Sequence, residues 1–117
     1  MATTGVSARN KGNSYERKIA GEFRALGWLK TLTSRLASKL RDDEKVDLVG
    51  TDPFNIQCKA VESAIKHAEL LEEMPKDGNI NVIFHKRNRK ELVILFKKDF
   101  YKLIIGMGKD KEKKSGK

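Results

Sequence analysis

Apolar side chains recur with helical spacing near the start of the chain. Separations of four, four and three residues put four of them on one helix face: Tyr15, Ile19, Phe23 and Leu26. We therefore expect a helix from Asn13 to about residue 26, ended by Gly27. The preceding residues 1–11 are small, polar and basic, which predicts a flexible arm.

Shorter apolar runs and alternating patterns predict the remaining elements. Strands are expected over five segments: 28–33, 46–50, 54–61, 80–84 and 92–96. The last two are continuous apolar runs, typical of strands buried on both faces. Two more helices are expected, one over 63–74, capped by Ser63 and ended by Pro75, and one over 98–105, ended by Gly106.

Charged segments separate these elements. Residues 34–45 indicate a surface loop, and the basic residues 85–90 the tip of a hairpin. The resulting order, α-β-β-β-α-β-β-α, predicts an α/β fold in which helices flank a mixed β-sheet. The 117 residues fit one domain, which we expect over 12–108. A tail over 109–117 has five Lys against two acidic residues and nothing apolar, which predicts disorder.

Composition points to an anionic partner inside the cell. The formal charge is +9, from 25 Lys and Arg against 16 Asp and Glu, which favours nucleic acid. Cys58 is the only cysteine, so an internal disulfide and a zinc finger are excluded and a reducing compartment is favoured. No apolar run suits a membrane span or a signal peptide. We expect the cytoplasm, either at the nucleoid or, for a viral protein, in the host.

Three polar residues are expected to converge on paired strands. Gln57 and Lys59 lie two positions apart in one strand, so their side chains share a face. Asp47 lies ten residues before Gln57, on the preceding strand of an expected hairpin that turns through residues 51–53. An acid, an amide oxygen and an amine would then meet at one strand pair.

Glu16 is the fourth candidate. At about 100° of rotation per residue, its side chain falls inside the core-facing arc of the first helix. Burying an unpaired charge is costly, so we expect it to meet a cation, a metal or a hydrogen-bond network. The alternative is a capping box in which Asn13 is the N-cap and Glu16 the third helical residue.

These four residue types suit phosphodiester hydrolysis. A hard cation, Mg²⁺ with Mn²⁺ as a substitute, needs oxygen ligands of the kind that Asp47, Gln57 and Glu16 offer. Lys59 would then place or activate the attacking water and stabilise charge in the transition state. The sequence therefore predicts a metal-dependent DNA nuclease.

The same residues carry a resemblance to a known family. The pattern Asp47-x9-Gln57-x-Lys59, preceded by a helix with the run Lys11-Gly12-Asn13-Ser14-Tyr15-Glu16-Arg17, resembles the PD-(D/E)XK nuclease superfamily. Within it, the chain looks most like the archaeal-type Holliday junction resolvases, which include viral and phage relatives. The likeness runs from about residue 11 to residue 105.

The resemblance implies a restriction-endonuclease-like fold and a homodimer that cuts branched or duplex DNA. It implies Glu16, Asp47, Gln57 and Lys59 as catalytic residues. The metal ligands expected with this motif are Asp47, Gln57, Glu16 and the backbone carbonyl of Cys58. Gln57 departs from the family, in which glutamate is usual, and its neutral amide should hold the metal more weakly. Other branches of the superfamily have a Gln-x-Lys form.

Residues outside the motif are expected to contact partners. Those expected to contact DNA are Arg9, Lys11, Arg17, Ser34, Arg35, Lys39, Arg41, Lys86, Arg87 and Arg89. Exposed apolar residues of the last helix are candidates for the dimer contact, and they are Phe100, Leu103 and Ile104. Neither His67 nor His85 has a partner at metal-ligand spacing, so we expect both on the surface.

Two other functions fit the sequence less well. A non-catalytic DNA-binding module on the same fold would explain the neutral Gln57, although binding alone does not require Lys59. A basic RNA-binding protein is the third possibility, but the basic segments lack the interleaved aromatic residues on which single-stranded bases stack.

Overall fold

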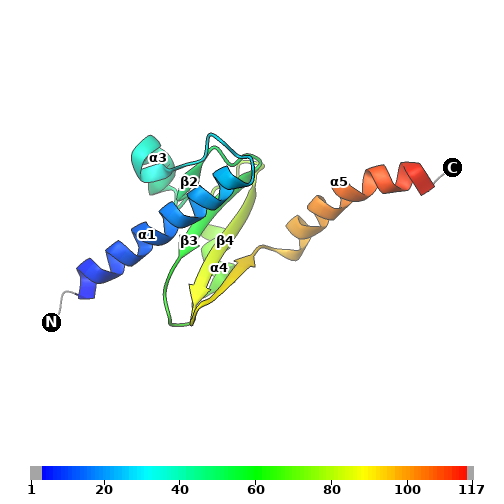
Figure 1. Ribbon diagram of the computed structural model, residues 1–117. Coiled ribbons are helices and arrows are strands. Elements are labelled where there is room, and N and C mark those ends of the chain that lie inside the picture. Colours follow the sequence, from blue (N-terminus) through cyan, green and yellow to red (C-terminus); the bar gives the residue numbers. More distant parts are fainter. Residues whose placement is uncertain (1–3, 116–117) are drawn as a thin grey trace.

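The computed structural model describes residues 4–115, and side chains within 12–107 (Figure 1). Its helices are α1 (Thr4–Ala25), α2 (Ser34–Ala37), α3 (Lys39–Asp43), α4 (His67–Glu73) and α5 (Lys97–Ser115). Its strands are β1 (Leu32–Thr33), β2 (Leu48–Val49), β3 (Phe54–Lys59), β4 (Ile80–Arg87) and β5 (Lys90–Ile94). The described chain is therefore a mixed α/β fold, as the sequence predicts.

The strands form two small sheets instead of the single expected sheet. β3, β4 and β5 make a three-stranded mixed sheet, in which β3 is parallel to β4 and β4 antiparallel to β5. β1 and β2 form a separate antiparallel pair. The expected hairpin between residues 46–50 and 54–61 is wrong, because β2 pairs with β1 and β3 takes β4 as its ladder partner. Parallel pairing requires a long crossover, which α4 provides.

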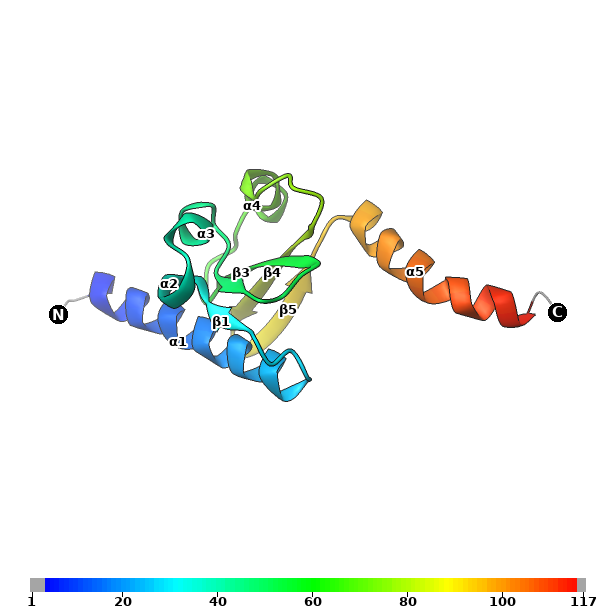
Figure 2. The same cartoon turned by 90° about the horizontal axis from the view of Figure 1, so that it is seen from above.

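Helices cover both faces of the three-stranded sheet. Figure 2 shows α1 on one side of it and α4 on the other. Against α1 lies the larger core, to which β3 contributes one face, as the alternation predicts: Phe54, Ile56 and Cys58, followed by Ala60. The smaller core joins Leu71 and Met74 beneath α4 to Ile83 of β4. The opposite face of β3 carries Gln57 and Lys59.

Both terminal helices are longer than the sequence predicts. α1 begins at Thr4, so an arm over residues 1–11 is wrong for 4–11, and residues 1–3 lie outside the described part. Asn13 is therefore internal to the helix, and the capping-box interpretation of Glu16 is wrong. α5 passes Gly106 and continues to Ser115, into the tail expected over 109–117. A helical glycine costs only about 1 kcal/mol, so Gly106 alone does not end a helix.

The middle of the chain differs in its local elements. Only the last two residues of the strand expected over 28–33 are paired, and the loop expected over 34–45 contains α2 and α3. The hydroxyl of Ser38 caps α3 by accepting a hydrogen bond from the backbone N–H of Arg41 at 3.3 Å. α4 begins at His67 with Lys66 as N-cap, so Ser63 is not its cap.

The hairpin of β4 and β5 is where the sequence predicts it. Its turn lies at Asn88 and Arg89, both with positive φ, as a two-residue hairpin turn requires. Burial of β5 on both faces is wrong, because Leu92 and Val93 are about half exposed. The helix that follows them, α5, projects away from the body and does not cover them (Figures 1 and 2).

Candidate functional site

Glu16 lies buried on α1 and meets a cation, as its position in the helix predicts. One guanidinium nitrogen of Arg35, Nη2, donates to both carboxylate oxygens of Glu16, at 2.9 and 3.1 Å. Burial raises the pKa of Glu16, and the negative charge of Asp47 raises it further, while Arg35 lowers it. Glu16 therefore shares its surroundings with a second carboxyl group and one arginine.

Asp47 is fixed against β3 by its backbone and its side chain. Its N–H donates to the carbonyl of Ile56 at 2.7 Å, and its Oδ2 accepts from the N–H of Cys58 at 2.7 Å. Its carbonyl accepts from the N–H of Ser34 at 2.8 Å, which ties the start of α2 to the same residue. Asp47 thus lies beside β3 as predicted. These single hydrogen bonds hold it there, because β2 and β3 form no β-ladder with each other.

Gln57 is the least satisfied polar residue of the candidate site. Its side chain is 4% exposed, and its Oε1 atom has no hydrogen-bond partner among the described residues. Leaving a buried acceptor without a partner costs about 1–3 kcal/mol. Folding tolerates such a cost at positions where a ligand later supplies the missing interaction.

Lys59 completes the set of four expected residues. It follows Gln57 on the same face of β3 and lies in register with His85 of β4. Its positive charge lowers the pKa of Asp47, so the amine is close enough to stabilise that carboxylate. Asp47 therefore interacts electrostatically with both Glu16 and Lys59. Along β3, Gln57 lies between Lys59 and Ile56, and the carbonyl of Ile56 accepts from the N–H of Asp47.

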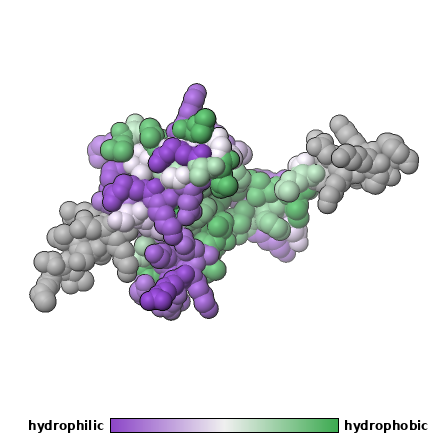
Figure 3. Space-filling model, viewed as in Figure 1, coloured by the Kyte–Doolittle hydropathy of each residue, from purple (hydrophilic) through white to green (hydrophobic). Residues whose placement is uncertain are grey.

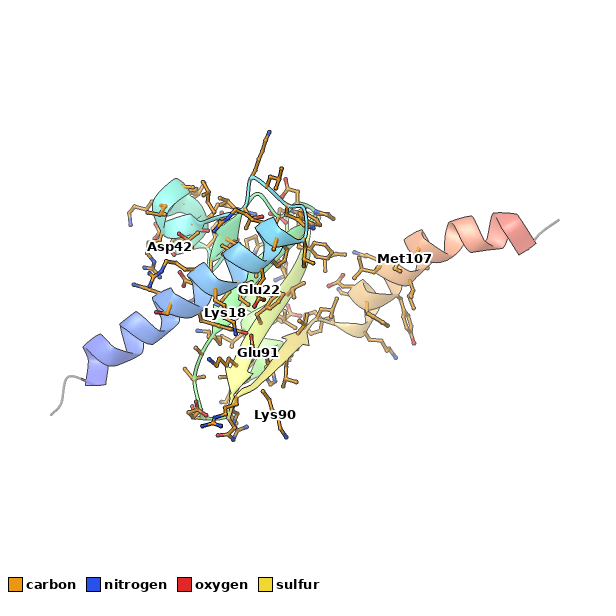
Figure 4. The ribbon with its side chains drawn as sticks, viewed as in Figure 1. Lys18, Glu22, Asp42, Lys90, Glu91 and Met107 are labelled. Atoms are coloured by element: carbon orange, nitrogen blue, oxygen red, sulfur yellow. The ribbon has the colours of Figure 1, made fainter. Side chains whose placement is uncertain are left out.

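A further acidic residue, Asp42, belongs to these surroundings and was not predicted. In Figure 4 its side chain lies on the side of α3 that faces α1. The Asp47 pKa is raised mainly by burial and also by the charge of Asp42, which raises the pKa of Glu16 as well. Glu16 and Asp47 are thus each destabilised as carboxylates by burial and by a neighbouring negative charge, which a bound cation would offset.

The donor set fits a hard divalent cation. Asp47 and Glu16 offer carboxylate oxygens, and Gln57 offers an amide oxygen that is otherwise unused. In a strand, the N–H and C=O of one residue point to the same edge, so the carbonyl of Cys58 faces the Asp47 side. The described side chains contain no group of three His, Cys, Asp or Glu residues at metal-binding spacing. Any metal would thus rely on the amide or a carbonyl as well as the two acids.

The basic residues expected to contact DNA have different surroundings. Arg17, Lys39 and Arg89 are exposed, and Lys86 is half-buried. Arg87 is exposed but donates through Nε to the carbonyl of Glu62, which joins the hairpin to the segment after β3. The side chains of Arg9 and Lys11 lie outside the described part of the chain.

Two of the expected DNA contacts are structural. Ser34 is fully buried, and its hydroxyl donates to the carbonyl of Val46 at 2.5 Å, so it cannot reach a phosphate. Arg41 donates to Glu44, Asp77 and Asn55, at 2.9, 3.3 and 2.6 Å. The bonds to Asn55 and Asp77 fasten α3 to the beginning of β3 and to the segment before β4. These two acceptors lie far along the chain, so sequence spacing gave no sign of them.

The two histidines form a pair that was also missed. His85 is 2% exposed, which corrects its expected surface position, and its Nδ1 lies 3.4 Å from Nε2 of His67. Its Nε2 lies 3.1 Å from the carbonyl of Val61, two residues after Lys59. If Nε2 donates to that carbonyl, Nδ1 accepts from His67. The pair therefore holds the segment that leaves β3 for α4.

Comparisons with known proteins give no relative: no family model, no curated protein and no solved structure matches the chain. Among the described residues, no helix has the length and apolar character of a membrane span. Inference about function therefore rests on the residues of the site.

Proposed function

We propose that this protein is a metal-dependent DNA endonuclease. The observation that carries the proposal is the electrostatic coupling of buried Glu16 to half-buried Asp47, and of Asp47 to Lys59, with an unpartnered amide oxygen on Gln57, two residues before Lys59. Carboxylates withdrawn from water and placed near one another are costly for folding alone. It is useful where phosphate chemistry requires a divalent cation.

Each residue then has a role in hydrolysis. Asp47, Glu16 and the Gln57 oxygen would hold Mg²⁺, with the carbonyl of Cys58 as a further ligand, and Mn²⁺ would substitute. Such an ion neutralises charge on a phosphate and makes water a stronger nucleophile. Lys59 would orient the attacking water and stabilise negative charge on the phosphate as the bond breaks.

DNA is the proposed substrate, and branched DNA in particular. The chain has a charge of +9, and the exposed Arg17, Lys39 and Arg89 can contact phosphates. The resemblance of the Asp-x9-Gln-x-Lys motif to Holliday junction resolvases supports four-way junctions as the substrate class. Two-fold cutting of a junction requires two sites, which a homodimer would supply.

An exposed apolar surface supports the proposed homodimer. Figure 3 shows apolar side chains gathered where α5 leaves the body. Phe100, Tyr101 and Ile104 are each more than 40% exposed there, whereas Leu103 packs against the larger core. A cavity of about 290 Å³ lined by apolar side chains adjoins them, and its walls come from α1, the three strands β3, β4 and β5, and the start of α5. Light scattering should give twice the 13.3 kDa chain mass if copies pair through this surface.

Cleavage by an Asp47→Asn variant tests the nuclease proposal. Labelled four-way, flap and linear DNA, and RNA of matching sequence, would be incubated with Mg²⁺ or Mn²⁺. Loss of the carboxylate should slow cleavage about 100-fold or more, while the amide still accepts from the N–H of Cys58 and preserves the fold. Asp43→Asn, an exposed carboxylate of α3, is the matched control and should cleave normally.

A second function, DNA binding without cleavage, is favoured by one observation. Arg35 already neutralises Glu16, and Gln57 adds no negative charge, so the site has less attraction for a cation than three carboxylates would have. In that case the wild-type protein should bind junctions but leave every DNA and RNA substrate intact with either metal. Cleavage by the Asp47→Asn variant at the wild-type rate would contradict both the proposed nuclease site and DNA binding without cleavage.

A further inference from the structure

Arg35 occupies the atoms of Glu16 that a cation would need. Its Nη2 bonds to both carboxylate oxygens, at 2.9 and 3.1 Å. The Glu16 side chain is 8% exposed, whereas that of Arg35 is 43% exposed, so the arginine covers the carboxylate from the solvent side. A divalent ion and this guanidinium cannot use the same lone pairs at once.

The backbone of Arg35 is fixed but its side chain has one partner. Ser34, directly before it, bonds to the carbonyls of Asp47 and Val46, so the start of α2 is held by the candidate site itself. Within the part of the chain that the structure describes, Glu16 is the sole hydrogen-bond acceptor of Arg35. If the Arg35 side chain left Glu16, it would therefore break no other hydrogen bond. The movement would require only rotation of a long, half-exposed side chain.

Released from Glu16, Arg35 would lie beside the site with an unused donor fork. Guanidinium groups match phosphate oxygens in geometry and charge better than any other side chain. A phosphate brought to Asp47 and Lys59 would lie within the same surroundings. The arrangement thus links two events, entry of a cation and capture of a phosphate.

We propose that Arg35 is an exchangeable counter-ion, bound to Glu16 in the metal-free protein and transferred to a DNA phosphate when a divalent cation takes its place. The transfer to phosphate rests on the proposed function. The competition between Arg35 and the cation does not depend on cleavage and can be measured without DNA.

The proposal predicts opposite effects of one substitution. Arg35→Gln should tighten metal binding, since the competing charge is removed, and weaken junction binding, since the phosphate contact is lost. A purely structural role would weaken both. A simple phosphate contact would weaken DNA binding and leave metal affinity unchanged.

The experiment compares Arg35→Gln with Lys39→Gln in the full chain. Lys39 lies on the neighbouring α3, is exposed and pairs with Asp43, so its loss removes the same charge without touching Glu16. Mn²⁺ binding would be followed without DNA by the electron paramagnetic resonance signal of the free ion. Junction binding would be followed by fluorescence anisotropy with Ca²⁺ present.

We expect the Mn²⁺ dissociation constant of Arg35→Gln to fall about tenfold, as for removal of a partly buried competitor, and that of Lys39→Gln to change by about twofold or less. Junction affinity should fall in Arg35→Gln, and Lys39→Gln, which also removes a proposed phosphate contact, serves as the control for Mn²⁺ binding alone. Arg35→Lys, which keeps the charge, should bind Mn²⁺ with intermediate strength.

Equal or weaker Mn²⁺ binding by Arg35→Gln, with an unchanged melting temperature, would overturn the proposal while leaving a metal site and the nuclease function in place. If Arg35→Gln fails to fold, Mn²⁺ binding by Arg35→Lys no stronger than wild type would overturn it. If neither the wild type nor any variant binds Mn²⁺, both this inference and the nuclease function are wrong.

Discussion

Glu16 and Asp47 are carboxyl groups in surroundings that oppose their charge. Burial raises the pKa of both, so folding favours their protonated forms. A raised pKa contributes stability that is fully present below the unfolded pKa and is lost as the pH rises through the folded one. At neutral pH these charged groups therefore cost stability, and a bound cation would restore it.

Substitution of Asp42 tests how the carboxyl groups are coupled. Because its charge raises the pKa of Glu16 and Asp47, Asp42→Asn should lower both pKa values. If cleavage requires both groups ionised, the acidic limb of the kcat/KM profile should move to lower pH. The profile of Asp43→Asn, the next residue, should match the wild type. An unmoved limb, or one at higher pH, would contradict the coupling.

At the residue scale, local periodicity predicted the surroundings of some residues of the candidate site but not of others. Helical spacing predicted that Glu16 is buried, and alternation predicted that Gln57 and Lys59 share a face. Arg35 reaches Glu16 from a separate four-residue helix, and Asp42 reaches the site from the next one. Contacts of this kind depend on how the chain folds back, which no short sequence pattern encodes.

At the scale of elements, the β1–β2 pair fixes the segment that carries Asp47. Gly50, directly after β2, has φ +77°, and a Cβ atom there would lie 2.4 Å from the backbone carbonyl oxygen of Lys30. The close approach of the backbones at Gly50 and Lys30 allows the β1–β2 pair to form next to β3. Only glycine accommodates both the dihedral angle and the contact.

Gly50→Ala should therefore lower the free energy of unfolding by about 2 kcal/mol or more, from backbone strain and a steric clash together. Urea titration would measure the change. Gly78→Ala is the matched control: its φ is +92° but no atom lies within 4 Å, so strain alone should cost about 1 kcal/mol. Equal losses in the two variants would show that the contact with Lys30 is unimportant.

Element types were easier to predict from sequence than element partners. Strand β3, its buried face and the basic hairpin of β4 and β5 all follow from local patterns. The expected hairpin before Gln57 failed because β2 has two residues and pairs with β1, while β3 pairs with the distant β4. Strand partners are chosen by packing against α1 and α4, which local periodicity does not contain.

At the scale of the whole molecule, the α/β class followed from the order of elements, but the position of the last helix did not. α5 extends from the body and leaves apolar residues exposed (Figure 2). The first helix, in contrast, is tied to the sheet: in Figure 4 Lys18 of α1 points toward Glu91 of β5, and the Lys18 amine donates to the Glu91 carboxylate at 2.8 Å.

The central claim is that one divalent ion binds among residues 16, 47, 57 and 59. Anomalous diffraction from crystals grown with Mn²⁺ tests it most directly. We predict a single strong peak within bonding distance of a carboxylate oxygen of Asp47 and of Oε1 of Gln57, with Lys59 nearby. A peak bound elsewhere, or none at this position while Mn²⁺ is in excess, would contradict the account.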